Sequence, residues 1–163
     1  MMTTYNIAIL GAGHIAEKMA HTLQQMPRAN SYAVASRSLE KAQQFAQRWG
    51  FSKAYGSYTD MLADPAIDLV YVATPHAMHY SHVLQCLQAG KAVLCEKAFT
   101  CNAREAEALI HEAEARKLLL AEAIWTRYMP FSKTITEWVN SGVIGRPKML
   151  TANLCYPVEY KER

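Results

Sequence analysis

The stretch YNIAILGAGHIAEKMA, residues Tyr5–Ala20, decides how the rest of the chain is interpreted. Its first part, Asn6–Leu10, is a short apolar run without alternation, which is typical of a strand covered on both faces in a parallel sheet. Gly11, Gly13 and Ala16 follow within six residues, and the apolar residues after them recur at helical spacing. The pattern predicts a strand, a tight turn and a helix.

Short β-rich runs and amphipathic runs alternate along most of the chain. The runs interpreted as strands are Asn6–Leu10, Tyr32–Ser36, Ser52–Gly56, Asp68–Pro75, Ala92–Lys97 and Leu118–Ile124. This β-α alternation with short connections predicts a doubly wound parallel sheet of the Rossmann type, in an α/β dinucleotide-binding domain over residues 1–124. Ligands of such sheets bind beyond the carboxyl ends of the strands.

The pattern changes after the sixth strand. The segment Trp125–Pro130 is interpreted as a link, Phe131–Ser141 as a helix, and Lys148–Tyr156 as a fresh strand. A single strand cannot bury its faces alone. Residues 125–163 are therefore predicted to be a linker helix and the first strand of an incomplete C-terminal substrate domain. The sequence is interpreted as a fragment that ends in the truncated start of this second α/β domain.

Composition and charge narrow the class of protein. The 163 residues are 51% hydrophobic and 19% charged, as in ordinary globular domains. A formal net charge of +3 is too small to favour nucleic acid or an anionic membrane as a partner. No apolar run is long enough to span a bilayer, and the N-terminus does not resemble a signal peptide. The four cysteines show no CxxC pair, so reduced thiols and a cytoplasmic location are expected.

The glycine motif has a chemical interpretation. In a G-x-G-x-x-G/A run between a strand and a helix, Gly11 makes the tight turn, Gly13 leaves space for a pyrophosphate, and Ala16 allows the helix to pack closely on the strand. The helix that begins at His14 and Ile15 offers unpaired N–H groups and a partial positive charge to the phosphates. A bare tight turn is the alternative. The strand before the motif, the helix after it and the further β-α alternation favour a dinucleotide cradle.

The end of the second strand distinguishes NADP from NAD. An NAD site places a carboxylate there to accept a hydrogen bond from the ribose 2′-hydroxyl, whereas an NADP site places donors and positive charge there. This strand ends in Ser36, Arg37 and Ser38, without a carboxylate, and Arg37 can pair with a 2′-phosphate. The alternative is a solvated Arg37 beside a Ser38 that only caps a helix. The sequence favours NADP over NAD.

Three histidines lie in the segment TPHAMHYSH after the fourth strand. His76, His79 and His82 recur at every third residue, which resembles a zinc-ligand spacing, but no further ligand is placed nearby and no metal site is predicted. Thr74 and Pro75 end the strand at the ligand-binding edge of the sheet, so together with His76 they are expected at the cofactor. His79 is expected to form a cap or a hydrogen bond at the cofactor, and His82 is interpreted as a helix-surface residue.

The fifth strand ends in CEKAFT, with Glu96 and Lys97 where the nicotinamide end of a dinucleotide should lie. A lysine there can donate a hydrogen bond to a substrate hydroxyl or carbonyl and stabilise alkoxide charge during hydride transfer. Glu96 can orient this lysine, and both residues are expected at the cofactor. The alternative is an exposed ion pair on a loop.

Taken in order, ILGAGHIA, ASRSLEKA, ATPHAMHYSH, GKAVLCEKAFT and EAIWTRYMP resemble the Gfo/Idh/MocA oxidoreductase family, most closely its dihydrodiol dehydrogenase / NADP-xylose dehydrogenase branch. The resemblance covers nearly the whole chain. It implies an enzyme that transfers a hydride between NADP(H) and a hydroxyl or carbonyl of a small-molecule sugar or cyclic diol. It also implies that Lys97 is the catalytic residue and that Trp125 and Arg127 lie at the cofactor.

The chain departs from the family pattern in two ways. Ala98 stands where the family has the proline of E-K-P, which predicts a looser loop around Lys97. The family's second catalytic residue, a His or Tyr of the C-terminal domain, is expected beyond Arg163, so the fragment alone is expected to be inactive. The resemblance further implies a homo-oligomer for the full-length protein.

A non-catalytic dinucleotide-binding sensor of the same fold is the alternative function. Lys97 favours the enzyme, because a sensor has no need of a catalytic lysine. Ala98 and the expected truncation are both compatible with a sensor, so this alternative stays open.

Overall fold

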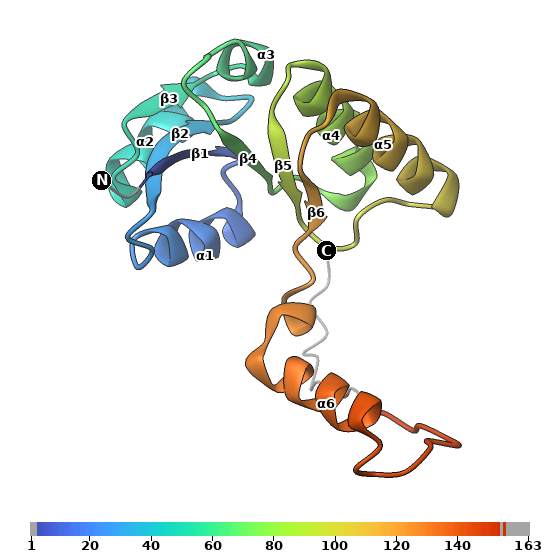
Figure 1. Cartoon of the computed structure of the whole chain (residues 1–163). Coiled ribbons are helices and arrows are strands. Elements are labelled where there is room, and N and C mark those ends of the chain that lie inside the picture. The colour runs from blue at the N-terminus through green and yellow to red at the C-terminus, as the bar shows by residue number, and fades with distance from the viewer. Residues whose placement is uncertain (1–2, 154, 156–163) are drawn as a thin grey trace. The chain divides into compact units, whose positions relative to one another are not determined.

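The computed structural model describes residues 3–153 and 155. The chain separates into two compact units, Met1–Ile124 and Trp125–Arg163, and each is described by itself. Figure 1 shows the first unit as a twisted sheet with helices packed against it.

The first unit is built on one six-stranded sheet in which every neighbouring pair of strands is parallel. The strands are β1 Tyr5–Leu10, β2 Ala29–Ala35, β3 Lys53–Tyr55, β4 Leu69–Val72, β5 Ala92–Cys95 and β6 Leu120–Glu122. Their order is β3-β2-β1-β4-β5-β6, which is the order of dinucleotide-binding domains. The prediction of a doubly wound Rossmann sheet is therefore confirmed. The strand order reverses between β1 and β4, where such sheets bind their ligands.

Helices cover both faces of the sheet (Figure 1). They are α1 His14–Leu23, α2 Leu39–Trp49, α3 Tyr58–Leu62, α4 His79–Gln88 and α5 Ala103–Arg116, and a 3-10 turn, η1 His76–Met78, precedes α4. One buried cluster joins the sheet to α1 and α2, and a second joins it to α3, α4 and α5. Ile7 and Ile9 of β1 belong to the first cluster, whereas Ala8 and Leu10 belong to the second. The strand is apolar at successive positions because both of its faces are covered.

Side-chain caps fix where several helices begin. The Ser38 hydroxyl accepts a hydrogen bond from a first-turn N–H of α2 at 3.3 Å, and Gly50 ends this helix with a φ of 73°. At the start of α5, the Asn102 side chain accepts from the Glu105 N–H at 3.0 Å. The Glu105 carboxylate in turn accepts from the Cys101 N–H at 3.1 Å, as in a capping box.

The last residues of three predicted strands lie outside the sheet. β4, β5 and β6 end at Val72, Cys95 and Glu122, two or three residues before the predicted ends. At each of these points the backbone leaves the sheet at its carboxyl edge. The residues beyond form the loops of the candidate site described below.

The second unit contains a 3-10 turn, η2 Trp125–Tyr128, and a helix, α6 Pro130–Ser141, which confirms the helix predicted here. The predicted strand Lys148–Tyr156 is wrong for the residues that are described. Residues 148–153 and 155 are in neither helix nor strand, and 154 and 156 lie outside the described residues. A strand forms only where a neighbour takes its backbone hydrogen bonds, and no described strand pairs with this segment.

Candidate functional site

Gly11 makes the tight turn that follows β1. Its φ of +102° lies in a region that glycine adopts without strain and other residues do not. A Cβ at this position would lie 3.1 Å from both Ala73 O and Thr74 Cγ2. The Gly11 N–H donates to Ala35 O at 2.9 Å, so the turn is held between β2 and β4. Ala16 is fully buried against the sheet and lets α1 pack closely.

The N-terminus of α1 is open to a ligand. Gly13 is its N-cap residue, and α1 has no side-chain cap among the described residues, unlike α2, α3 and α5. The first N–H groups, which include those of His14 and Ile15, therefore lack an intrahelical partner. A Cβ at Gly13 would meet no atom within 4 Å. This space, beside unpaired N–H groups and the positive end of a helix, fits a pyrophosphate.

The segment Ser36–Ser38 lies at the carboxyl end of β2. Ser36 is buried, and its N–H donates to Tyr55 O at 3.1 Å, which fixes the segment to the end of β3. Arg37 is exposed and forms no ion pair with any residue that the structure describes. Burial raises the pKa of the nearby Tyr58, and the Arg37 charge opposes this rise. The guanidinium therefore lies at the binding edge with its charge uncompensated by a described carboxylate.

The residues after β4 lie at the same edge. Thr74 is buried with its Oγ1 3.0 Å from His82 Nδ1, while Pro75 and His76 are exposed. The prediction that His82 lies on the helix surface is wrong. His82 belongs to the buried side of α4, whose residues recur at spacings of three and four and face the sheet. Burial lowers the pKa of His82, and the neighbouring His79 adds to this effect.

His79 joins the loop after β4 to the loop after β5. Its ring is fully buried, with Nε2 2.8 Å from Thr74 O and Nδ1 2.7 Å from Ala98 O. Both ring nitrogens thus contact carbonyl oxygens of the protein rather than the space where the cofactor was expected. The difference from the prediction arises because the first turn of α4 directs this side chain between the two loops. His79 holds the backbone of the site from behind.

Glu96 and Lys97 begin the loop after β5. The Glu96 N–H donates to Val72 O at 3.0 Å. One oxygen of the Glu96 carboxylate accepts a hydrogen bond from the Tyr71 hydroxyl, and the other accepts from the Lys97 N–H at 3.1 Å. Burial, and then the bond to Glu96, raises the pKa of Tyr71, so the phenol remains a donor. The side chain of Lys97 is exposed, whereas the start of its loop is anchored.

The loop beyond Lys97 is held as well. Ala98 O contacts the His79 ring, and the Phe99 N–H donates to Glu122 Oε1 at 2.9 Å. The Lys97–Ala98 peptide bond is cis. These contacts from α4 and β6 hold the loop beyond Lys97, while the looser loop expected from alanine in place of proline stays a prediction.

Tyr71 and Glu122 contribute to this site, although the sequence assigns neither of them a role. Tyr71 lies inside a run interpreted as a strand, and Glu122 lies near the carboxyl end of another such run, where ligands of these sheets bind. A signal was present, because a polar group in a buried apolar run needs a hydrogen-bond partner.

Trp125 and Arg127 lie on η2 in the second unit, and both are exposed. The glycine turn and Lys97 belong to the first unit. Their place at the cofactor stays a prediction.

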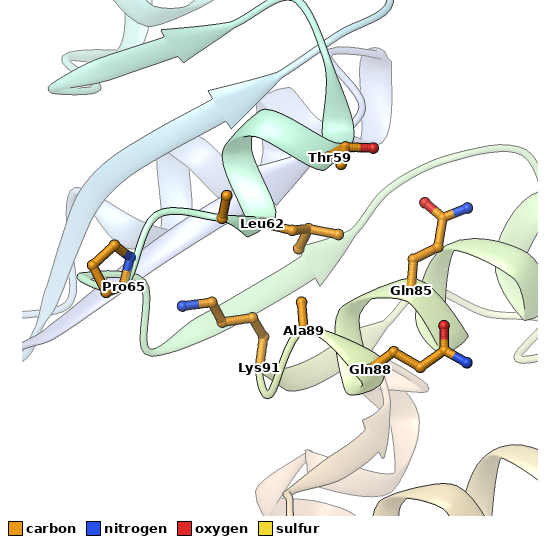
Figure 2. A pocket seen from close by; sticks show the side chains of 8 residues that line it. Thr59, Leu62, Pro65, Gln85, Gln88, Ala89 and Lys91 are labelled. Atoms are coloured by element: carbon orange, nitrogen blue, oxygen red, sulfur yellow. The ribbon is translucent and has the colours of Figure 1, made fainter.

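A hollow of about 620 Å³ lies at the opposite edge of the sheet (Figure 2). It is bordered by α3 and α4 and by Pro65 and Lys91, which precede β4 and β5. The buried Lys91 ammonium donates to Asp64 O at 2.7 Å and to Ile67 O at 3.2 Å. Because this ammonium already donates to backbone carbonyls and the hollow lies away from the carboxyl edge of the sheet, we assign the hollow no part in dinucleotide binding.

The described residues contain neither a candidate metal cluster nor a candidate membrane-spanning helix. No group of three or more His, Cys, Asp or Glu residues within the described ranges could hold a metal ion. Among the helices of the same residues, none is long and apolar enough to cross a membrane.

Comparison with known sequences gives a consistent set of relatives. The chain is 45% identical over 154 residues to D-xylose 1-dehydrogenase (NADP(+)) of Hypocrea jecorina, a match that covers 87% of this chain and 39% of that protein. It is 42% identical over 139 residues to trans-1,2-dihydrobenzene-1,2-diol dehydrogenase of Homo sapiens, covering 84% and 42%. The chain therefore spans less than half the length of these relatives.

Solved structures and a family model agree with these relatives. An NAD binding oxidoreductase from Klebsiella pneumoniae superposes with a TM-score of 0.84 at 26% identity, over 89% of this chain and 41% of that one. KijD10, a 3-ketoreductase from Actinomadura kijaniata in complex with NADP, gives 0.80 at 30% identity, over 88% and 46%. The family model described as "Oxidoreductase family, NAD-binding Rossmann fold" matches residues 5–123, from β1 to the end of β6. With the glycine turn, the parallel sheet and the Lys97 loop all inside this range, the chain belongs to the Gfo/Idh/MocA family of oxidoreductases.

Proposed function

We propose that this chain provides the cofactor-binding part of an NADP-dependent oxidoreductase that acts on a hydroxyl or carbonyl group of a sugar or cyclic diol. The observation that carries the proposal is the pairing of an uncapped α1 N-terminus with Arg37, in place of a carboxylate, at the end of β2. The names of the relatives, an NADP(+) xylose dehydrogenase and a dihydrobenzenediol dehydrogenase, support this cofactor and this substrate class.

Different parts of the site serve different parts of the cofactor. The N–H groups of α1 and the space at Gly13 hold the pyrophosphate, and Ser36 and Arg37 bind the 2′-phosphate. The segment Thr74–His76 forms a wall at the switch point. When bound, the nicotinamide supplies the hydride acceptor or donor. Lys97, anchored through Glu96, donates a hydrogen bond to the substrate oxygen and stabilises the negative charge that develops there.

The proposal extends to the organisation of the whole protein. Residues 1–124 form its dinucleotide-binding domain, and residues 125–163 begin its substrate domain. Trp125 and Arg127 lie at the nicotinamide end of the cofactor. The whole protein is a cytoplasmic homo-oligomer.

The test is a comparison of NADPH and NADH affinities by fluorescence titration. Arg37→Ala should weaken NADPH binding about tenfold to a hundredfold, because a charge-assisted hydrogen bond is lost, and should leave NADH binding nearly unchanged. Arg28→Ala is the matched control. Arg28 precedes β2 at its other end, where its Nε donates to Thr3 O at 3.3 Å, so neither affinity should change.

Two results would contradict the cofactor assignment. One is equal affinity of the unaltered chain for NADPH and NADH. The other is an equal loss of both affinities in Arg37→Ala, which would mean that the guanidinium does not meet a 2′-phosphate.

A further inference from the structure

The backbone around Lys97 is held by side chains and not by regular secondary structure. The N–H of Lys97 is bound by the Glu96 carboxylate at 3.1 Å. The N–H of Phe99 is bound by the Glu122 carboxylate at 2.9 Å. The backbone that carries the Lys97 side chain is therefore held at two N–H groups, that of Lys97 and that of Phe99, and each of them donates to a carboxylate. Bonds to an ionised acceptor are stronger than bonds between neutral groups.

The position of Glu122 follows from the pairing of β5 and β6. Glu122 is the last residue of β6 and pairs with Cys95, the last residue of β5. The Ala123 N–H donates to Cys95 O at 2.7 Å, which continues the pairing to the point where the Lys97 loop leaves the sheet. A half-buried carboxylate at this point reaches the loop from the last residue of a paired strand.

We propose that Glu122 is a positioning residue for Lys97 and acts through the Phe99 N–H. The bond fixes the backbone on the C-terminal side of Lys97, while Glu96 fixes it on the other side. A lysine has a long flexible stem, so the direction in which it is presented depends on a fixed backbone at its base. This inference rests on the proposed function, in which Lys97 lies at the nicotinamide end of the cofactor.

The first measurement is amide hydrogen exchange of the whole chain by NMR. Glu122→Leu removes the acceptor at similar volume, and exchange of the Phe99 amide should accelerate about tenfold or more. Glu122→Gln keeps an acceptor oxygen, and exchange should stay within a few-fold of the unaltered chain. Glu105→Leu is the control, because it removes the same type of bond at Cys101 and should accelerate exchange there but not at Phe99.

The second measurement is the rate at which a limiting amine reagent modifies Lys97, with and without saturating NADPH. Bound NADPH should protect Lys97 in the unaltered chain, in Glu122→Gln and in Glu105→Leu. Protection should fall severalfold in Glu122→Leu, although this variant still binds NADPH at the saturating concentration. A role in stability alone would change the melting temperature and leave this protection intact.

The outcomes separate the inference from the function on which it rests. Unchanged Phe99 exchange in Glu122→Leu, or faster exchange with undiminished protection of Lys97, would overturn the positioning role alone. Absence of protection in the unaltered chain at saturating NADPH would overturn the place of Lys97 at the cofactor, and the inference with it. Faster exchange with lost protection, restored in Glu122→Gln, would support it.

Discussion

Gly11 and Gly13 belong to one motif but have different surroundings. At Gly11, the protein itself excludes a side chain, because φ is +102° and a Cβ would lie 3.1 Å from each of two atoms. At Gly13, a Cβ would have no atom within 4 Å, so only a ligand would exclude a side chain. Replacement of Gly11 should therefore affect the stability of the fold, whereas replacement of Gly13 should affect ligand binding.

We expect Gly11→Ala to lower the melting temperature by several degrees, since a strained φ costs about 1–3 kcal/mol. Gly13→Ala should leave the melting temperature unchanged and weaken NADPH binding about tenfold or more, because the methyl group occupies the space for the pyrophosphate. Thermal unfolding and fluorescence titration of both variants check this. Full NADPH affinity in Gly13→Ala would show that the phosphates do not lie at this turn.

At the scale of single residues, the sequence predicted those features that depend only on local backbone conformation. Gly11 needs its φ whatever the packing, and its place between strand and helix could be predicted from the motif. His79 and His82 were misplaced because the direction of a helical side chain depends on which face of the helix meets the sheet. The role of Glu122 could not be predicted, because its partner is a backbone N–H from another strand's loop, which no local pattern shows.

At the scale of elements, Asp64 ties the connection between α3 and β4 to two other strands. Its carboxylate accepts from Lys53 Nζ at 2.7 Å, from Tyr55 OH at 2.7 Å and from Tyr32 OH at 3.1 Å. Its other oxygen accepts from the Ala66 N–H at 3.0 Å. Lys53 first, then Tyr55 and the Ala66 N–H, hold the pKa of Asp64 well below its usual range.

This depressed pKa predicts how stability depends on pH. The stabilisation is fully present above the unfolded pKa of about 3.9 and is lost as pH falls through that value toward the folded one. Asp64→Asn should lower the melting temperature at pH 7 by about 5 °C or more, since the amide has one acceptor oxygen where the carboxylate had two and carries no charge to pair with Lys53. The gap to the unaltered chain should shrink below a pH of about 4. Thermal unfolding across this range measures it.

Asp60→Asn is the control for this prediction. Asp60 is exposed on the same helix, α3, and its replacement should leave the melting temperature nearly unchanged at every pH. A gap between Asp64→Asn and the unaltered chain that stays constant from pH 7 to a pH of about 2.5 would show that ionisation of Asp64 does not stabilise the fold.

The helices and strands of the sheet could be predicted from hydrophobic periodicity and helix caps. One predicted strand, Lys148–Tyr156, was wrong over its described residues for a physical reason. The helices α2 and α5 begin at Ser38 and Asn102, whose side chains accept the first free N–H groups. These signals are local. A strand depends on a neighbour, so Lys148–Leu150 and the residues after it could not be assigned from their own sequence.

At the scale of the whole molecule, the chain matches only part of the length of each relative. The glycine turn, Arg37 and Lys97 all lie in the first unit, within the range of the family match. The chain nevertheless spans only 39% of the xylose dehydrogenase and 42% of the dihydrobenzenediol dehydrogenase. Cofactor binding and turnover should therefore separate in this chain.

We expect the 163-residue chain to bind NADPH but to show no turnover of D-xylose or of a trans-dihydrodiol with NADP(+). Every group proposed for the phosphates lies in the first unit, whereas correct positioning of a substrate supplies several kcal/mol of barrier lowering and needs walls on all sides of it. Absorbance of NADPH at increasing substrate concentration measures the turnover. The Hypocrea jecorina enzyme is the positive control, and Lys97→Ala is the background. Turnover that Lys97→Ala abolishes would contradict the prediction, because the residues of this chain would then suffice for both the cofactor and the substrate.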